Sequence, residues 1–459
     1  MSECHWEPSR SGDGWVLVNP LNTTYKGQLS KYRATKAILF TCRQWYHVGY
    51  HLLFRFLFLL DPSKLPSLCF ALDRNASLGC LPEIENILVS IIHQCPNLEN
   101  FTIDWPITPS FLPIADALCT FSAQSLRSIH WSLSPAALPR LIWTLDSLPS
   151  LMSAFINFEP SSDSNDQVDK TLLLGSASSL SLVLPSLEQL LLRGFSSDFV
   201  DQLIGWSLPA LKSFSLDFIA QRHDLPDVLE FLKYHGSSLT FLDLNTIPAI
   251  DLSSILDFCP VLTTFCFNPD WRLPFHAEVN SQNPGAPQPT LLRSSHAHIT
   301  HIGLHQLLHA FTPSITRGLN PLLTPVATYM IQRTNDLTFG QLTRQFFPSL
   351  KVIRVLNRVL LRELEKNNGP ENVGGCFARW EWWEEQCRRE DVRLEDCTGA
   401  LLGELPEDEE ESESDSDESE VQFKPANALE LKQLLEECRK MTMTRQEPMM
   451  FSPPPMRWQ

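Results

Sequence analysis

The chain lacks any long apolar run, and this absence excludes a simple membrane-spanning helix. Such a helix needs about twenty consecutive apolar residues, whereas Arg43, His47, His51 and Arg55 interrupt the apolar stretch near the N-terminus. No opening segment combines a basic start, an apolar run and a small-residue cleavage site, so we expect no secretory signal. We therefore expect an intracellular protein, in the cytoplasm or the nucleus, that makes no membrane contact.

Paired cysteines and an excess of basic residues are also missing. The twelve cysteines include no C-x-x-C pair, which favours reduced thiols over a disulfide framework. The formal charge of −17 argues against nucleic acid as a partner, because phosphate binding needs a basic surface. Ten of the acids lie in residues 407–420, so the other residues together carry only about −7.

The motifs of common enzyme classes are absent as well. The sequence contains no G-x-x-x-x-G-K-[ST] or G-x-G-x-x-G loop, no G-x-S-x-G elbow and no H-E-x-x-H helix. On a helix, His301, His305 and His309 would share one face and could hold zinc. No acid or cysteine lies nearby, and the same stretch also fits a strand. We expect no metal, no cofactor and no catalytic residue, and hence not an enzyme.

One pattern recurs along the chain: a leucine followed by apolar residues three and five positions later. Six of its nine copies carry a proline two places before the leucine, and neighbouring copies lie mostly 23–28 residues apart, with two gaps near 36. Leucine-rich repeats have a period of about 20–29 residues. The copies are PNLENFTI at 96–103, QSLRSIHW at 124–131, PSLMSAFI at 149–156, PSLEQLLL at 185–192, PALKSFSL at 209–216, SSLTFLDL at 237–244, PVLTTFCF at 260–267, AHITHIGL at 297–304 and PSLKVIRV at 348–355.

Each copy predicts a short strand, and the residues after it predict a helix. Leu187, Leu190 and Leu192 would enter the core, and Phe199, Leu203 and Trp206 have helical spacing. A single unit cannot bury its apolar face alone, so neighbouring units stack into a solenoid. We expect an α/β leucine-rich-repeat solenoid with parallel strands on the concave face and helices outside. The alternative is an ordinary α/β domain whose strands share a leucine bias.

Side chains alternate across a strand, so the residues between the core positions would lie on the concave face. Most of them are polar, which fits a solvated face as well as a binding face. Curved repeat arrays bind partners on this side, and we expect a protein target there. The candidate residues are Asn100, Thr102, Asp104, His130, Gln189, Arg193, Ser213, Ser215, Asp217, Asp243, Asn245 and Asn268.

Before the repeats, residues 41–57 read TCRQWYHVGYHLLFRFL. Ile38, Cys42, Trp45, Gly49, Leu52, Leu53 and Phe56 recur at steps of three and four, which predicts one stripe of a helix. The stretch resembles the second half of an F-box at Cys42, Arg43, Trp45, Leu52, Leu53 and Phe54. F-box followed by leucine-rich repeats is the order of a large group of fungal proteins. The Leu-Pro start of that family is missing upstream of Cys42, so the F-box is diverged or truncated.

The resemblance implies a specific role. In that family the F-box docks onto a Skp-type linker and so onto a cullin ubiquitin ligase, and the repeats hold the target. The residues that would dock the linker are Cys42, Trp45, Leu52, Leu53 and Phe54. The alternative is a ligase-independent repeat scaffold that binds a protein partner, with residues 41–57 closing the end of the array.

The expected organisation has six parts. Loops are expected inside the repeats at 159–170 and 280–290, where the sequence is polar or rich in proline. The parts are a flexible tail at 1–28, an F-box-like helical segment at 29–75, repeats at 76–360, a C-terminal cap at 361–400 with a helix in 376–397, an acidic disordered tract at 401–426, and a short amphipathic helix with a tail at 427–459.

Overall fold

A computed structural model gives the fold of the chain. It describes residues 5–8, 15–18, 55–59, 65, 84–107, 111–159, 174–194, 197–217, 228–245, 252–269, 294–305, 307, 311, 325–357, 360, 364, 376–397 and 399–402. Tertiary contacts divide the chain into two units, Met1–Glu404 and Leu405–Gln459. All of the described residues belong to the first unit, so the acidic tract and the amphipathic helix expected at 427–459 lie outside them, apart from Leu401 and Leu402.

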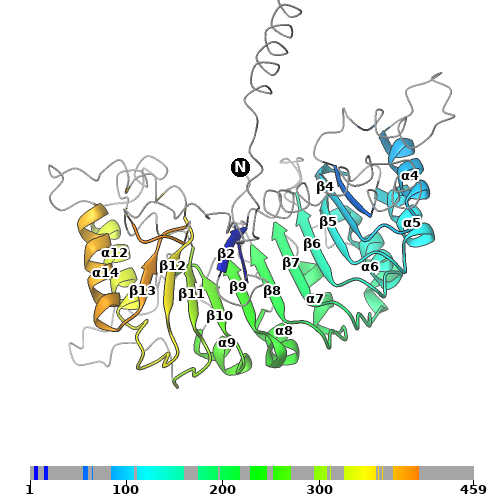
Figure 1. Ribbon diagram of the computed structural model, residues 1–459. Coiled ribbons are helices and arrows are strands. Elements are labelled where there is room, and N and C mark those ends of the chain that lie inside the picture. Colours follow the sequence, from blue (N-terminus) through cyan, green and yellow to red (C-terminus); the bar gives the residue numbers. More distant parts are fainter. Residues whose placement is uncertain are drawn as a thin grey trace, which may run out of the picture. The chain divides into compact units, whose positions relative to one another are not determined.

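The centre of the fold is one open sheet of eleven strands in sequence order, and every neighbouring pair is parallel. Figure 1 shows these strands side by side along a curve. The strands are β3 (Phe56–Leu59), β4 (Asn100–Pro106), β5 (Ser128–Leu133), β6 (Ser153–Phe158), β7 (Gln189–Gly194), β8 (Ser213–Asp217), β9 (Phe241–Asn245), β10 (Thr264–Phe267), β11 (His301–Leu304), β12 (Val352–Val355) and β13 (Arg393–Glu395).

Helices lie between most successive strands and cover the outer side of the curve, where α7, α8 and α9 follow one another in Figure 1. Neighbouring helices contact each other in the pairs α4–α5, α5–α6, α7–α8 and α8–α9. The helices are α4 (Ile84–Gln94), α5 (Phe111–Phe121), α6 (Leu138–Asp146), α7 (Ser197–Ile204), α8 (Val228–His235), α9 (Leu252–Phe258), α12 (Pro325–Phe339) and α14 (Cys376–Arg389), with 3-10 turns η4 (Pro135–Ala137), η5 (Gly175–Ser179) and η6 (Gly236–Ser238). The arrangement is a solenoid-like α/β fold.

The nine sequence repeats correspond to β4 through β12. In every copy the leading leucine or isoleucine is at most 1% exposed, as at Leu98, Leu211 and Ile299. The two following apolar positions also face the core, as Leu190 and Leu192 do in β7. The strand expected from each repeat is therefore confirmed, and so is the helical spacing of Phe199 and Leu203 in α7, both of which are buried. Trp206 is buried too but lies beyond the end of this helix.

The repeat pattern also explains where proline is tolerated. The backbone ladder of each unit begins one residue after the leading leucine: Glu99 N donates to the carbonyl of Arg55, and Lys212 N donates to that of Glu188. Pro96 and Pro209 stand before that point, where the missing N–H removes no ladder bond.

Both edges of the sheet differ from the expectation. The helical stripe predicted to run through Phe56 is wrong at its end, because Phe56–Leu59 is the strand β3 and pairs with β4. At the other edge the predicted helix is present as α14, but the same segment then adds β13. The short strand β13 contains one apolar residue, so it lacks the leucine signal and takes its conformation from the neighbouring strand.

Helix α14 covers the last units of the sheet through its tryptophans. Trp380 and Trp383 are 1% exposed, and the Trp383 ring stacks on Phe339 of α12 with ring centres 3.8 Å apart. The Trp383 Nε1–H donates to Asp336 at 3.0 Å. Trp382, which is 43% exposed, points outward. Helix α12 lies in the long sequence gap between Ile299 and Leu350.

Other expected features fall partly outside the described residues. The loops at 159–170 and 280–290 lie outside them, except Glu159. Within the tail expected at 1–28, His5–Pro8 (β1) and Trp15–Val18 (β2) form an antiparallel pair. Among the helices of the described ranges, none is long and apolar enough to cross a membrane.

Neighbouring leucines in β7 test the assignment of the two faces. Replacing Leu190 with alanine should lower the free energy of unfolding by about 2–5 kcal/mol, because a buried leucine leaves a cavity. Leu191→Ala, on the other face and only half-buried, should cost about 1 kcal/mol or less. Urea unfolding monitored by circular dichroism would measure both values. Equal losses would contradict the assignment of these side chains to opposite faces.

Candidate functional site

The second face of the sheet, opposite the helices, is the candidate site, and we call it the open face. The apolar residues of each strand join the core, so the alternate residues lie on this face. Strand pairing aligns them into rows. One row runs Thr102, His130, Phe155, Leu191, Ser215, Asp243, Cys266, Gly303, Arg354, Glu395.

The sequence placed twelve candidate residues on this face, and eleven of them have described side chains in or directly after β4, β5, β7, β8, β9 and β10. The twelfth, Asp104, belongs to β4. The expectation of a solvated face is wrong for more than half of them. Only Gln189 is exposed, and His130, Arg193 and Ser213 are half-buried. The buried ones are Asn100, Thr102, Ser215, Asp217, Asp243, Asn245 and Asn268, at 4–9% exposure.

Buried polar groups need partners, and one group of partners joins β7, β8 and β9. Arg193 Nε lies 3.4 Å from Asp217 Oδ2. Asn245 Nδ2 donates to Asp217 Oδ1 at 3.0 Å. Asp217 thus sits between a guanidinium and an amide on its two flanking strands. These residues are 24 and 28 positions apart in sequence, and only the strand register brings them together.

A second group centres on Asp243. Ser215 Oγ donates to Asp243 Oδ2 at 3.2 Å, and His305 Nε2 donates to Asp243 Oδ1 at 2.7 Å. A hydrolytic triad places the imidazole next to the hydroxyl, where it removes the proton. Here the carboxylate stands between the two, so this geometry orients polar groups and does not prepare Ser215 as a nucleophile.

Apolar residues on this face were missed in the sequence. Phe241, Cys266 and Leu356 form a small buried cluster apart from the main core. Phe155 is half-buried and meets the His130 ring edge-on, with ring centres 3.9 Å apart. The signal was available, because Phe155 and Phe241 have the same strand parity as the polar candidates.

A buried ion pair at β12 and β13 was also missed. Arg354 Nε donates to Glu395 Oε2 at 2.7 Å, and both residues are less than 7% exposed. Burial lowers the pKa of Arg354, and the nearby Glu395 opposes that shift. Gly399 lies against this arginine with φ +92°, and a Cβ there would come within 2.9 Å of Arg354 Nη2. Glycine therefore allows the chain to pass close to the guanidinium.

The histidine run is not a helix at His301 or at His305. His301 begins β11 and His305 follows it, both on the open face. A group of three or more His, Cys, Asp or Glu side chains suited to a metal ion does not occur among the described residues. The thiols are poor nucleophiles, since burial raises the pKa of Cys95 to about 11 and that of Cys259 and Cys387 to about 12.

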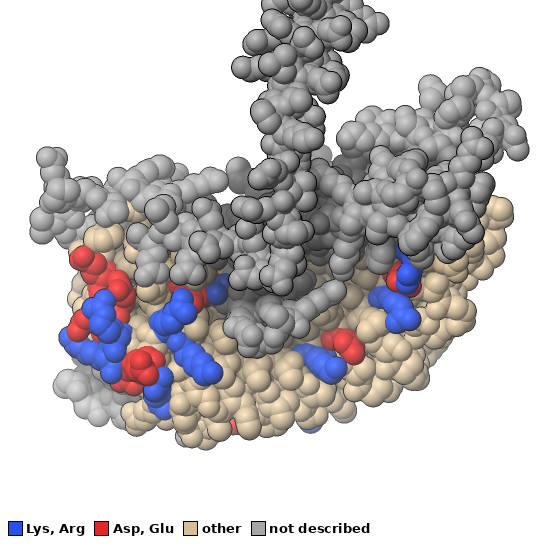
Figure 2. All heavy atoms as spheres, viewed as in Figure 1, with Lys and Arg blue, Asp and Glu red and all other residues tan. Residues whose placement is uncertain are grey.

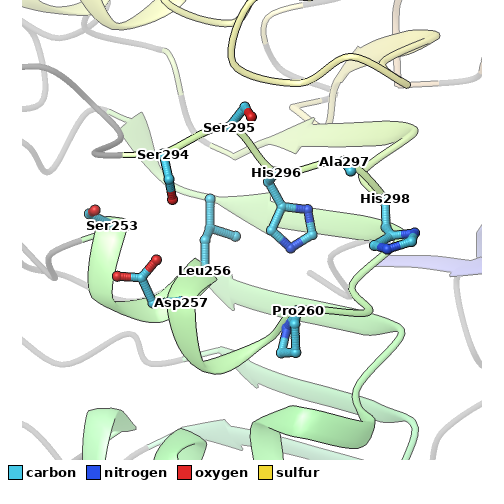
Figure 3. A pocket seen from close by; sticks show the side chains of 9 residues that line it. All are labelled: Ser253, Leu256, Asp257, Pro260, Ser294, Ser295, His296, Ala297 and His298. Atoms are coloured by element: carbon cyan, nitrogen blue, oxygen red, sulfur yellow. The ribbon is translucent and has the colours of Figure 1, made fainter.

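A pocket of about 240 Å³ lies on the helix side, between α9 and the segment leading into β11 (Figure 3). Its walls include Asp257, Ser294, His296 and His298. His296 Nε2 donates to the Cys259 carbonyl at 2.9 Å, and burial lowers the pKa of His296. This hydrogen bond fixes the imidazole between two neighbouring repeats, where it forms part of their packing.

On the face shown in Figure 2, the charged side chains of the described residues form small mixed groups. Glu188 and Lys212 pair at 3.4 Å, and Glu385 and Arg388 pair at 2.8 Å. Such exposed pairs contribute little to stability. Because the two signs alternate, these groups give no broad field of one sign.

Comparison with known proteins identifies no family: the chain matches no protein-family model and no curated protein. The residues expected to dock a linker protein, Cys42, Trp45, Leu52, Leu53 and Phe54, lie outside the described residues.

The Arg354–Glu395 pair yields a stability prediction. Glu395→Gln should lower the free energy of unfolding by about 3–5 kcal/mol, because it removes the carboxylate that is hydrogen-bonded to the buried guanidinium, and the charge of Asp396 nearby compensates only in part. The exposed pair is the matched control: Glu188→Gln should cost about 1 kcal/mol or less. Thermal and urea unfolding would measure both, and a small loss for Glu395→Gln would mean that water reaches Arg354.

His301 yields a pH prediction. Burial, and then the charges of Arg354 and Lys351, lower its pKa from 6.5 to about 4. A histidine whose pKa falls on folding stabilises the protein fully above its unfolded pKa, and that stability is lost as pH falls. Between pH 6.5 and pH 4 we expect a loss of up to about 1.4 kcal/mol per pH unit from this group. His301→Gln should flatten the profile in urea unfolding at several pH values. An unchanged slope would contradict this contribution.

Proposed function

We propose that the chain is a leucine-rich-repeat solenoid that works as a protein-interaction module and does no bond chemistry of its own. One observation carries the proposal. Eleven parallel strands in sequence order, with helices on the other side, gather side chains from distant parts of the chain onto one extended face. An extended face of this kind suits the surface of another protein better than a small molecule, which binds in a concave pocket.

The more specific form of the proposal is a substrate-recognition adaptor of an SCF-type (Skp–cullin–F-box) ubiquitin ligase. Its support is the resemblance of residues 41–57 to an F-box, directly before the sheet. In this form the linker protein contacts Trp45, Leu53 and their neighbours, and the open face holds the target. The protein then acts by holding the target close to the ligase.

The second candidate is a repeat scaffold that works without a ligase. A specific observation favours it: the end of the F-box-like stretch is part of the sheet. Arg55 forms an ion pair with Glu99, and Phe56–Leu59 pairs with β4. A segment so joined to the first strands could simply close the end of the array, as terminal units of solenoids do.

Binding to a purified Skp-type linker distinguishes the two. The adaptor form predicts a stable complex with the full chain in size-exclusion chromatography, lost in the double variant Trp45→Glu, Leu53→Glu. In the adaptor form these two side chains face the linker protein and not the core, so the melting temperature of the double variant should stay within about 2 °C of that of the unmodified chain. No complex with the unmodified chain removes the ligase role. A drop of about 5 °C or more in the double variant supports the scaffold.

The open face is tested separately by affinity purification and mass spectrometry. Gln189 and Ser213 are register partners on β7 and β8, and arginine at both should abolish target capture through steric and charge conflict. Tyr234, exposed on α8, is the control: Tyr234→Arg should leave capture unchanged. If both variants retain all specific partners, the open face does not bind the target.

A further inference from the structure

Asn245 on the open face has a buried hydrogen-bond acceptor with no partner among the residues that the structure describes. The residue is 7% exposed, and its Oδ1 is buried without a partner. Its amide orientation is fixed, because Nδ2 donates to the Asp217 carboxylate at 3.0 Å. Flipping the amide would turn Oδ1 toward that carboxylate, which cannot donate. Oδ1 must therefore stay as an acceptor, and a buried acceptor without a donor is costly enough to need an explanation.

The groups around this oxygen are rich in further acceptors. Asp217 and Asp243 stand on the neighbouring strands β8 and β9, and each carboxylate can accept about four hydrogen bonds. Their donors include Arg193 and Asn245 at Asp217, and Ser215 and His305 at Asp243. A carboxylate amid fixed acceptors favours a positively charged donor, and guanidinium and ammonium groups offer five and three N–H bonds.

Next to these acceptors the open face becomes apolar. In the row that contains Ser215 and Asp243, the preceding residues are Leu191 and Phe155, both half-buried. Leu191 in β7 is in register with Asp243 in β9, two strands away, and Asn245 lies two residues after Asp243. With about 4.8 Å between strands and about 3.3 Å per residue, the separation is about 12 Å, or three to four residues of extended chain.

We propose that this part of the open face binds an extended segment of a partner protein through one Arg or Lys side chain and one apolar side chain three or four residues away. The basic group reaches Asn245 Oδ1, Asp217 and Asp243, and the apolar group packs on Leu191 and Phe155. The inference rests on the proposed interaction function and adds the chemistry of the target.

Peptide selection followed by charge removal tests this inference. Random peptides of about twelve residues, long enough to cross several strands, are displayed against the full chain and the enriched sequences are read. We expect a basic residue three or four places from an apolar one. Replacing the selected arginine with citrulline, which keeps the shape and removes the charge, should weaken binding about tenfold or more in fluorescence polarisation.

Isosteric variants locate the contact. Asp217→Asn should lower the affinity for the arginine peptide about tenfold and leave the affinity for the citrulline peptide unchanged. This is the result that a double-mutant cycle gives when the two charges interact directly. Asp257→Asn makes the same charge change on α9 and should alter neither. Thermal melting checks each fold, and if Asp217→Asn does not fold, Asp243→Asn replaces it with the same readout.

Three results would overturn the inference: no enriched peptide, enriched peptides without a basic residue, or equal affinity of the arginine and citrulline peptides for the unmodified chain. The proposed function fails separately, when the unmodified chain captures no specific protein. Intact capture by Gln189→Arg, Ser213→Arg would instead mean that the target binds outside the open face. Peptides without a basic residue that compete with the captured target would sink only the inference and leave the interaction function standing.

Discussion

The whole fold depends on one constraint: a single strand-and-helix unit cannot bury its own apolar residues. In the unit of β8, Leu211, Phe214 and Leu216 are at most 2% exposed. They reach that burial only because units stand on both sides of them. Stacking in sequence order follows, since each unit meets the next as soon as it forms. Parallel strands and helices on one side follow in turn, and the remaining face of the sheet is left for side chains with other tasks.

The sequence predicted the core well because the constraint is local and periodic. An apolar triple at fixed offsets is visible in one dimension, and all nine copies became the strands β4 to β12. The short edge strand β13 has no such triple, because Leu394 is its only apolar residue. The spacing of the histidines suggested one face of a helix, but His301 begins a strand, and the reason is geometric. A spacing of four is even, so His301 and His305 share a face of a strand as readily as a face of a helix.

The sequence predicted which residues lie on the open face, but not that most of them are buried and paired with one another. Parity alone selects which residues lie there, and that rule held for the eleven candidates whose side chains are described. Their burial and pairing depend on register across strands. Arg193 meets Asp217, and Asp243 meets His305 over 62 positions of sequence. The amino-acid sequence alone does not specify which strand positions become neighbours. Neither the Arg354–Glu395 pair nor the buried Asn245 Oδ1 could therefore be predicted from it.

The stack of units has a further consequence for how the protein comes apart. Because each unit is held mainly by its neighbours, the array behaves as a one-dimensional chain of couplings in which distant parts can melt separately. Two buried tryptophans sit far apart in it: Trp131 in β5, beside Phe111, and Trp383 in α14, stacked on Phe339. The chain has twelve tryptophans, so each end is followed by fluorescence in a variant that keeps only Trp131 or only Trp383. The difference between the two melting temperatures would measure how strongly the middle repeats couple the ends of the array.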